Sequence, residues 1–144
     1  MSGTAIIELN SVNVFQKKHL VLSNIGLRIE KGELVYLVGK NGSGKSSFLK
    51  TLYGELNLVE GNAKVCDFEL KDVKRSKIPF LRRKIGIVFQ DFQLLSDRTV
   101  NENLKFVMKA TGWKNKKEIQ EGIQVVLGKV GLDNKGFKMP HELS

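Results

Sequence analysis

The sequence predicts an α/β domain, and three observations lead to that fold class. Apolar residues alternate with polar ones near the start, as in strands that are covered on one face. Residues 34–38 form a continuous apolar run that leads into a glycine-rich loop and then a helical pattern. Two further helical patterns follow. We therefore expect a mixed α/β core over about residues 1–98 and the start of a helical subdomain over about residues 99–144.

Short alternations predict a small antiparallel sheet. They involve Ile7 and Leu9, Val12 and Val14, and Ile25, Leu27 and Ile29. Residues 34–38, Leu-Val-Tyr-Leu-Val, are instead apolar without interruption, which is typical of a central parallel strand covered on both faces. Residues 63–65 and 85–89 predict two further short strands.

Helical spacing occurs in three places. After the glycine-rich loop, Phe48, Leu49 and Leu52 share one face of a helix, and Gly54 is a suitable end for it. Thr99 and Glu102 have the spacing of a capping box, which predicts a helix start there. The apolar positions of the two later helices are Val100, Leu104, Val107 and Met108, and then Ile119, Ile123, Val126, Leu127 and Val130.

The composition is that of one globular domain, with 41% hydrophobic and 27% charged residues. No apolar stretch approaches the length that crosses a bilayer, and the start has no basic region followed by an apolar run. We therefore expect neither a membrane span nor export. The single cysteine, Cys66, cannot form an internal disulfide, which favours the cytoplasm.

The formal net charge of +9 raises the question of an anionic partner. Lys and Arg are spread along the chain, with short groups at residues 17–18, 82–84 and 114–117. Aromatic residues are not interleaved with them as a stacking platform requires, so we expect no nucleic-acid partner. A solvated basic surface that faces anionic lipid or a membrane partner fits better.

Residues 39–46 contain the motif that indicates what the protein binds. They are Gly-Lys-Asn-Gly-Ser-Gly-Lys-Ser, with the Gly-x-x-x-x-Gly-Lys-Ser spacing of a phosphate-binding P-loop. The glycines permit backbone angles that let successive N–H groups turn toward phosphates, and the following helix directs its positive end at the same anion. The motif lies between a buried-strand pattern and a helical pattern, as it must, which argues against a chance match.

The residues of the loop have separate expected roles. Lys45 reaches the β- and γ-phosphates, the Ser46 hydroxyl ligates Mg²⁺, and Ser47 supports a phosphate oxygen. The expected phosphate-binding set is Gly39, Asn41, Gly42, Ser43, Gly44, Lys45, Ser46 and Ser47.

A P-loop alone does not decide among transporters, switch GTPases, kinases and helicases. Residues 25–34, Ile-Gly-Leu-Arg-Ile-Glu-Lys-Gly-Glu-Leu, resemble the lead-in to the P-loop in the ATP-binding cassette (ABC) family. Residues 87–90, Ile-Val-Phe-Gln, resemble the family's Q-loop, and the resemblance extends over essentially the whole chain. It implies an ABC-type P-loop ATPase fold, in which a small antiparallel β subdomain accompanies the nucleotide-binding core.

The resemblance also implies cofactors and further site residues. ATP and Mg²⁺ are the expected cofactors. Gln90 is expected to contact the Mg²⁺ or the attacking water, so that Lys45 and Gln90 are the expected catalytic residues and Ser46 and Gln90 the expected metal ligands. Phe15 is the expected aromatic on the adenine, at a place where the family usually has a tyrosine.

Residues 79–86 and 89–103 resemble most the branch of the family that acts in cell division, in particular through Asp-Arg-Thr-Val at residues 97–100. This branch implies a homodimer of ATP-binding subunits on the inner face of the cytoplasmic membrane. ATP hydrolysis there drives a conformational change in an integral membrane subunit. ATPases for lipoprotein release, macrolide efflux and methionine import share the pattern at fewer positions and are alternatives.

Residues 141–144, His-Glu-Leu-Ser, resemble the approach to the family's signature motif. The family's Walker B aspartate, catalytic glutamate and switch histidine have no counterpart in the sequence. Asp91 is a weak substitute, since a loop carboxylate is the simpler explanation for it. We therefore expect this chain to be part of a longer domain. On its own, its residues 34–38 lack neighbouring strands, and we expect it not to hydrolyse ATP.

Two other functions are compatible with a P-loop. A small P-loop kinase would need an acceptor site and an arginine-rich lid, and the Phe-Gln pair followed by a capped helix argues against it. A non-catalytic module, in which nucleotide only switches a protein contact, would bind nucleotide without turnover.

Overall fold

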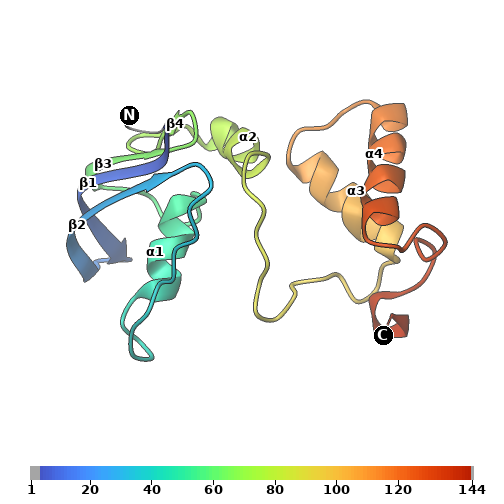
Figure 1. The fold of residues 1–144 in the computed structure, drawn as a ribbon, viewed down its shortest axis with the longest axis horizontal. Coiled ribbons are helices and arrows are strands. Elements are labelled where there is room, and N and C mark those ends of the chain that lie inside the picture. Colours follow the sequence, from blue (N-terminus) through green and yellow to red (C-terminus); the bar gives the residue numbers. More distant parts are fainter. Residues whose placement is uncertain (1–3, 144) are drawn as a thin grey trace. The chain divides into compact units, whose positions relative to one another are not determined.

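The computed structural model describes residues 4–143. Ser144, part of the expected approach to the signature, lies outside the described residues. The chain divides into two compact units, one ending at Ile85 and the other beginning at Gly86 (Figure 1). Among the described residues, no helix combines the length and the apolar character that crossing a bilayer requires.

The first unit contains a four-stranded antiparallel sheet, as the alternations predict. Its strands are β1 (Ala5–Gln16), β2 (His19–Glu30), β3 (Glu60–Val65) and β4 (Phe68–Glu69). Their order across the sheet is β2-β1-β3-β4, and β1 is the long strand that pairs with both β2 and β3. The two-residue strand β4 was not predicted, because it is too short to show an alternation.

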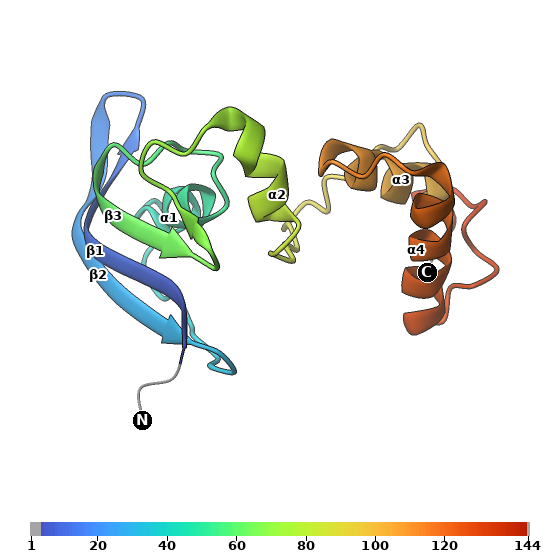
Figure 2. The ribbon, with the colours of Figure 1, turned by 90° about the horizontal axis from the view of Figure 1, so that it is seen from above.

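A helix, α1 (Lys45–Leu52), lies against one face of this sheet (Figures 1 and 2). Its Phe48 is buried and Leu52 packs against the core, whereas the predicted core residue Leu49 is half exposed. The core joins the inner faces of β1 and β3 to α1 and to the segments that follow β4. Its buried residues are Leu9, Val12, Val14, Phe48, Leu58, Ala63, Val65, Leu70 and Leu81.

The helix α1 ends at the predicted glycine. Gly54 has φ +70°, its N–H donates to the carbonyl of Thr51, and the N–H of Glu55 donates to the carbonyl of Lys50. These two bonds satisfy the last carbonyls of the helix in the Schellman arrangement, which needs a residue with positive φ. A Lys50–Glu55 ion pair of 2.7 Å spans the same turn.

Two predicted strands are absent, and these predictions were wrong. Residues 34–38 and 85–89 have no regular secondary structure. A strand needs a neighbour to pair its N–H and C=O groups, and none of the described residues pairs with either segment. The apolar run is consequently uncovered, with Leu34 79% and Val38 88% exposed.

The uncovered run borders an apolar hollow of about 580 Å³ within the first unit. The inner face of the β1–β2 hairpin, α1 and residues 35–39 line it. The lining side chains include Leu22, Leu27, Val35, Leu37 and Phe48. Part of the run thus lies beside other apolar groups, although no strand among the described residues pairs with it.

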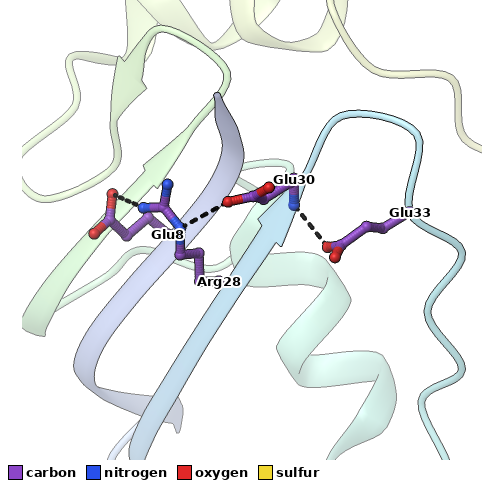
Figure 3. Close-up of polar contacts among 4 residues, drawn as sticks. All are labelled: Glu8, Arg28, Glu30 and Glu33. Atoms are coloured by element: carbon purple, nitrogen blue, oxygen red, sulfur yellow. Dashed lines mark hydrogen bonds and ion pairs between the residues drawn. The ribbon is translucent and has the colours of Figure 1, made fainter. Parts of the chain in front are cut away.

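The turn from β2 into this run is fixed by a small polar network (Figure 3). Arg28 on β2 lies 3.6 Å from Glu8 on β1 and 3.4 Å from Glu30. The backbone N–H of Glu30 donates to the Glu33 carboxylate at 2.7 Å, and Gly32 has φ +90°. The segment that leads to the glycine-rich loop thus begins at a defined point of the sheet.

A 3-10 helix, η1 (Arg75–Lys77), continues into α2 (Ile78–Arg82). Leu81 of α2 is fully buried, which fixes one side of the helix on the core. Arg82 donates to the carbonyl of Tyr53 at 3.1 Å, and its guanidinium lies 5.8 Å from the Tyr53 ring centre. Burial and a hydrogen bond to Glu55 raise the pKa of Tyr53 to about 12.

The second unit contains the predicted helical pair, α3 (Val100–Ala110) and α4 (Lys116–Lys129), and a 3-10 turn, η2 (Pro140–Glu142). The capping box is confirmed, since Glu102 N–H donates to Thr99 Oγ1 and Thr99 N–H donates to the Glu102 carboxylate. The core of this second unit holds Ile119, Ile123 and Leu127, with Val100, Leu104 and Met108 packed against them. Three predicted core positions are largely exposed instead, namely Val107, Val126 and Val130.

Candidate functional site

The glycine-rich loop of the first unit follows the geometry that its sequence demands. Gly42 and Gly44 have φ of +79° and +92°, and the N–H of Ser43 between them donates to the carbonyl of Lys40 at 3.2 Å. A Cβ at Gly39 would lie 2.7 Å from Ser43 Oγ, so a larger residue there would require the Ser43 side chain to move.

The β2 strand packs against the end of the loop. A Cβ at Gly44 would lie 2.7 Å from Val21 Cγ1 and 3.0 Å from Leu22 Cγ, so no larger residue fits between the loop and the sheet. The sequence alone did not indicate this contact. It holds the loop and the start of α1 against the β1–β2 hairpin.

The start of α1 offers backbone donors to an anion. Gly44 is the N-cap, no side chain caps the helix, and no acidic residue lies in its first turn. Among the described residues no acceptor takes the N–H groups of residues 44–47. These donors and the helix dipole make the loop and helix start fit a phosphate group.

Lys45 is already positioned over the loop. Its ammonium donates to the carbonyl oxygens of Gly39 and Lys40 at 2.7 and 2.8 Å. An ammonium has three N–H donors, so these bonds leave one without a partner among the described residues. The lysine therefore holds the loop and also presents a positive charge to an anion bound there.

The hydroxyl residues of the first turn differ in exposure. Ser46 is exposed, Ser47 is half-buried, and Asn41 is exposed in the turn before the helix. Within residues 4–143, no three His, Cys, Asp or Glu side chains gather as a metal site. A Mg²⁺ ion held by an exposed serine hydroxyl and by the phosphates of a nucleotide fits this arrangement without such a cluster.

Phe15 lies near the end of β1, half-buried and outside the core. It pairs with Leu20, and the preceding Val14 pairs with Leu22, whose side chain contacts the position of Gly44. The hairpin end that carries Phe15 is therefore next to the strand residues that support the loop. Contact between Phe15 and an adenine remains a prediction.

Gln90 belongs to the second unit, where it is exposed in a turn. The N–H of Phe92 donates to the carbonyl of Phe89 at 3.2 Å, and Phe92 and Gln93 both have positive φ. The expected contact of Gln90 with a Mg²⁺ ion at Ser46 remains a prediction from the resemblance.

One buried polar residue of the second unit was missed at the sequence level. Asn103 is only 8% exposed, and its amide bonds the backbone of residues 95–99. The available signal was an asparagine on the apolar side of the predicted helix, beside Val100 and Leu104, where a polar group needs partners.

Comparisons with known proteins agree with this geometry. A family model described as "ABC transporter" matches residues 22–144. The cell division ATP-binding protein FtsE of Streptococcus pneumoniae serotype 2 is 37% identical over 97% of this chain. The methionine import ATP-binding protein MetN of Clostridium tetani is 36% identical over 96% of it. The chain spans 61% of the FtsE sequence and 43% of the MetN sequence.

The structural comparison leads to the same group. The dimeric, post-hydrolysis ATP-binding cassette MJ0796 bound to ADP and Pi superposes with a TM-score of 0.75 and 27% identity, covering 96% of this chain and 63% of that one. The sheet, loop and helices thus define an α/β P-loop nucleotide-binding protein. More specifically, the chain belongs to the ABC ATPase family, as its sequence resemblance predicts. This membership excludes the small-kinase alternative.

Proposed function

We propose that the first unit binds ATP through residues 39–47, as the nucleotide-binding part of an ABC ATPase that acts in cell division. One observation supports ATP binding most directly. The same loop offers unpaired backbone N–H groups and the Lys45 ammonium. ATP and Mg²⁺ supply a phosphoanhydride bond and charge neutralisation when they are bound. The chain's own residues bind and orient the phosphates.

Each loop residue has a specific task in this proposal. Lys45 exchanges its bonds to the Gly39 and Lys40 carbonyls for bonds to phosphate oxygens, which are stronger because both partners are charged. Ser46 and Gln90 are the proposed Mg²⁺ ligands, and Phe15 the proposed adenine contact. A Ser46→Ala change should remove most of the gain in nucleotide affinity that Mg²⁺ provides, while affinity in the presence of EDTA stays the same.

FtsE relatives are 37–41% identical to this chain and MetN relatives 32–36%, a small difference, so the specific role also rests on particular residues. Residues 97–100, Asp-Arg-Thr-Val, favour the cell-division branch. In the structure these residues are firmly held, since Asn103 bonds the carbonyls of Arg98 and Thr99 and the Arg98 guanidinium lies 5.4 Å from the Phe106 ring centre. A rigid polar segment of this kind suits a docking surface.

The proposed partner of this segment is an integral membrane subunit similar to FtsX. Two ATP-binding subunits would associate at the inner face of the cytoplasmic membrane, and nucleotide would change the conformation of the membrane subunit. The dimeric state of MJ0796 supports the pairing of two subunits. We also propose that the nucleotide-binding core ends, and the helical subdomain begins, near residue 98.

Chimeric proteins test the branch. The chain would replace the matching part of S. pneumoniae FtsE in one chimera and of C. tetani MetN in another. Each chimera would be co-expressed with the membrane subunit that belongs to the remainder. Co-purification and nucleotide-dependent activity only in the FtsE chimera are expected.

Methionine uptake is the second candidate, because the MetN relative covers the chain as completely as FtsE does. Function of the MetN chimera alone would establish the importer role and overturn the cell-division proposal. Loss of ATP binding in both chimeras would overturn the loop assignment itself.

A further inference from the structure

The positive charge of the chain is concentrated in one short segment of the first unit. Residues 71–84 contain seven Lys or Arg residues and one Asp, so this tenth of the sequence carries six of the nine net positive charges. The segment runs from the end of the sheet through η1 and α2. This concentration of positive charge is not evident in the sequence, because apolar residues separate the cations.

The cations of this segment are exposed and mostly uncompensated. Five of them, Lys71, Lys74, Arg75, Lys77 and Lys84, are exposed and have no carboxylate within 4.0 Å among the described residues. Arg82 is directed instead to the Tyr53 carbonyl and ring. Because like charges repel, such a group is stabilised by an anionic partner surface.

An exposed aromatic side chain belongs to the same segment. Leu81 of α2 is fully buried, whereas the neighbouring Phe80 is 46% exposed. The Arg83 guanidinium lies 6.0 Å from the Phe80 ring centre, and the exposed Lys77 and Lys84 lie within two residues of the ends of α2. We name the exposed side chains of Lys74, Arg75, Lys77, Phe80, Arg83 and Lys84 the α2 basic face.

We propose that the α2 basic face binds directly to a membrane surface rich in anionic phospholipid headgroups. The cations contact the phosphates, and the Phe80 ring enters the boundary between headgroups and acyl chains. Long lysine stems suit this role, since they cover apolar surface while their charges stay at the headgroups. This contact is separate from the proposed membrane subunit and does not depend on it.

A membrane fits these observations better than a nucleic acid does. Binding of single strands without sequence preference uses several aromatic rings on which bases stack, and the face has Phe80 as its one aromatic residue. Duplex binding uses a helix or ribbon that enters a groove, whereas α2 has five residues and is fixed to the core by Leu81. A short, exposed cationic segment with one exposed ring suits an anionic layer.

Sedimentation with lipid vesicles tests the proposal on the purified 144-residue chain. The vesicles are pure phosphatidylcholine, or phosphatidylcholine with one quarter phosphatidylglycerol, at about 0.15 M salt. The chain should sediment with the anionic vesicles and stay in solution with the neutral ones. Each cation at the surface contributes roughly a fivefold factor in affinity, so the triple change Lys74→Glu, Arg75→Glu, Lys77→Glu should weaken binding by about a hundredfold.

A matched control separates this face from net charge. The triple change Lys114→Glu, Lys116→Glu, Lys117→Glu lowers the formal charge by the same six units at exposed positions of the second unit, and should weaken binding by less than about fivefold. Phe80→Ala, which keeps all charges, should weaken binding by about tenfold. Circular dichroism of each variant checks that the fold is kept.

Three results would overturn the proposal. Equal losses in the two triple variants would mean attraction by net charge alone. Equal sedimentation with neutral vesicles would mean that the headgroup charge is irrelevant. Tighter binding to a mixed-sequence RNA than to anionic vesicles at the same salt, lost in the Lys74, Arg75 and Lys77 variant, would identify a nucleic acid as the partner instead.

Discussion

Asn103 and Leu95 are joined by two hydrogen bonds that run in opposite directions. Leu95 N–H donates to Asn103 Oδ1 at 2.8 Å, and Asn103 Nδ2 donates to the Leu95 carbonyl at 3.0 Å. The same amide nitrogen lies 3.1 Å from the Arg98 carbonyl and 3.0 Å from the Thr99 carbonyl. One side chain on α3 thus defines the path of residues 95–99.

Asn103→Ala should destabilise the second unit by about 2 kcal/mol, because a part-buried N–H and three carbonyls each lose a partner. Hydrogen exchange should show the amide of Leu95 losing protection, while the first unit is unchanged. The control is Asn115→Ala, which removes the N-cap of α4 and should affect α4 only. Unchanged protection of the Leu95 amide in the Asn103 variant would contradict the role of Asn103 in holding residues 95–99.

Lys45→Ala should weaken ATP binding by at least about a hundredfold, because charge-assisted bonds to the phosphates are lost. The chain should stay folded, since the hydrogen bonds that Lys45 makes among the described residues go to two carbonyls of the loop. Calorimetry measures the affinity, and circular dichroism measures the fold. Wild-type affinity in a folded variant would remove the phosphate assignment of the loop.

The double exchange Asp97→Arg, Arg98→Asp should weaken co-purification with an FtsX-like subunit by about tenfold or more, because charge complementarity at the docking surface is reversed. Net charge is kept. A matched control is Lys117→Glu, Glu121→Lys, which exchanges an exposed pair on α4. Full recovery of the complex with the first variant would show that another surface contacts the membrane subunit.

Acid should loosen the start of α3. The backbone N–H and then the hydroxyl of Thr99 hold the pKa of Glu102 below its usual value of 4.5. A carboxylate with a lowered folded pKa contributes stability above its unfolded pKa, and this contribution disappears as the pH falls through the folded pKa. An NMR titration of Glu102 should give the lowered pKa, and Thr99→Ala should raise it. A Glu102 pKa that Thr99→Ala leaves unchanged would contradict this cause.

The sequence predicted those elements whose local signals agree with their surroundings. The hairpin β1–β2, the helix starting at Lys45 and the capped helix at Thr99 each combine apolar periodicity with a turn or cap. The loop geometry could be predicted as well, because the positive φ angles at Gly42 and Gly44 follow from the motif.

The errors arose where structure depends on distant partners. Residues 34–38 have the pattern of a buried strand, yet pairing is a property of two segments and cannot be seen in one. Asn103 was missed because its partners lie eight and fewer residues away in an irregular loop. The α2 basic face was missed because apolar residues separate its cations in the sequence and because their exposure is a property of the fold.

The glycine-rich loop is anchored unequally at its two ends. Its carboxyl end continues into α1, where Phe48 is buried, while its amino end follows the uncovered residues 34–38. A loop that is tethered on one side loses more conformational entropy when it closes on a ligand. Any strand that pairs with residues 34–38 would remove part of this cost and tighten nucleotide binding. By thermodynamic linkage, bound nucleotide would favour that pairing by the same factor.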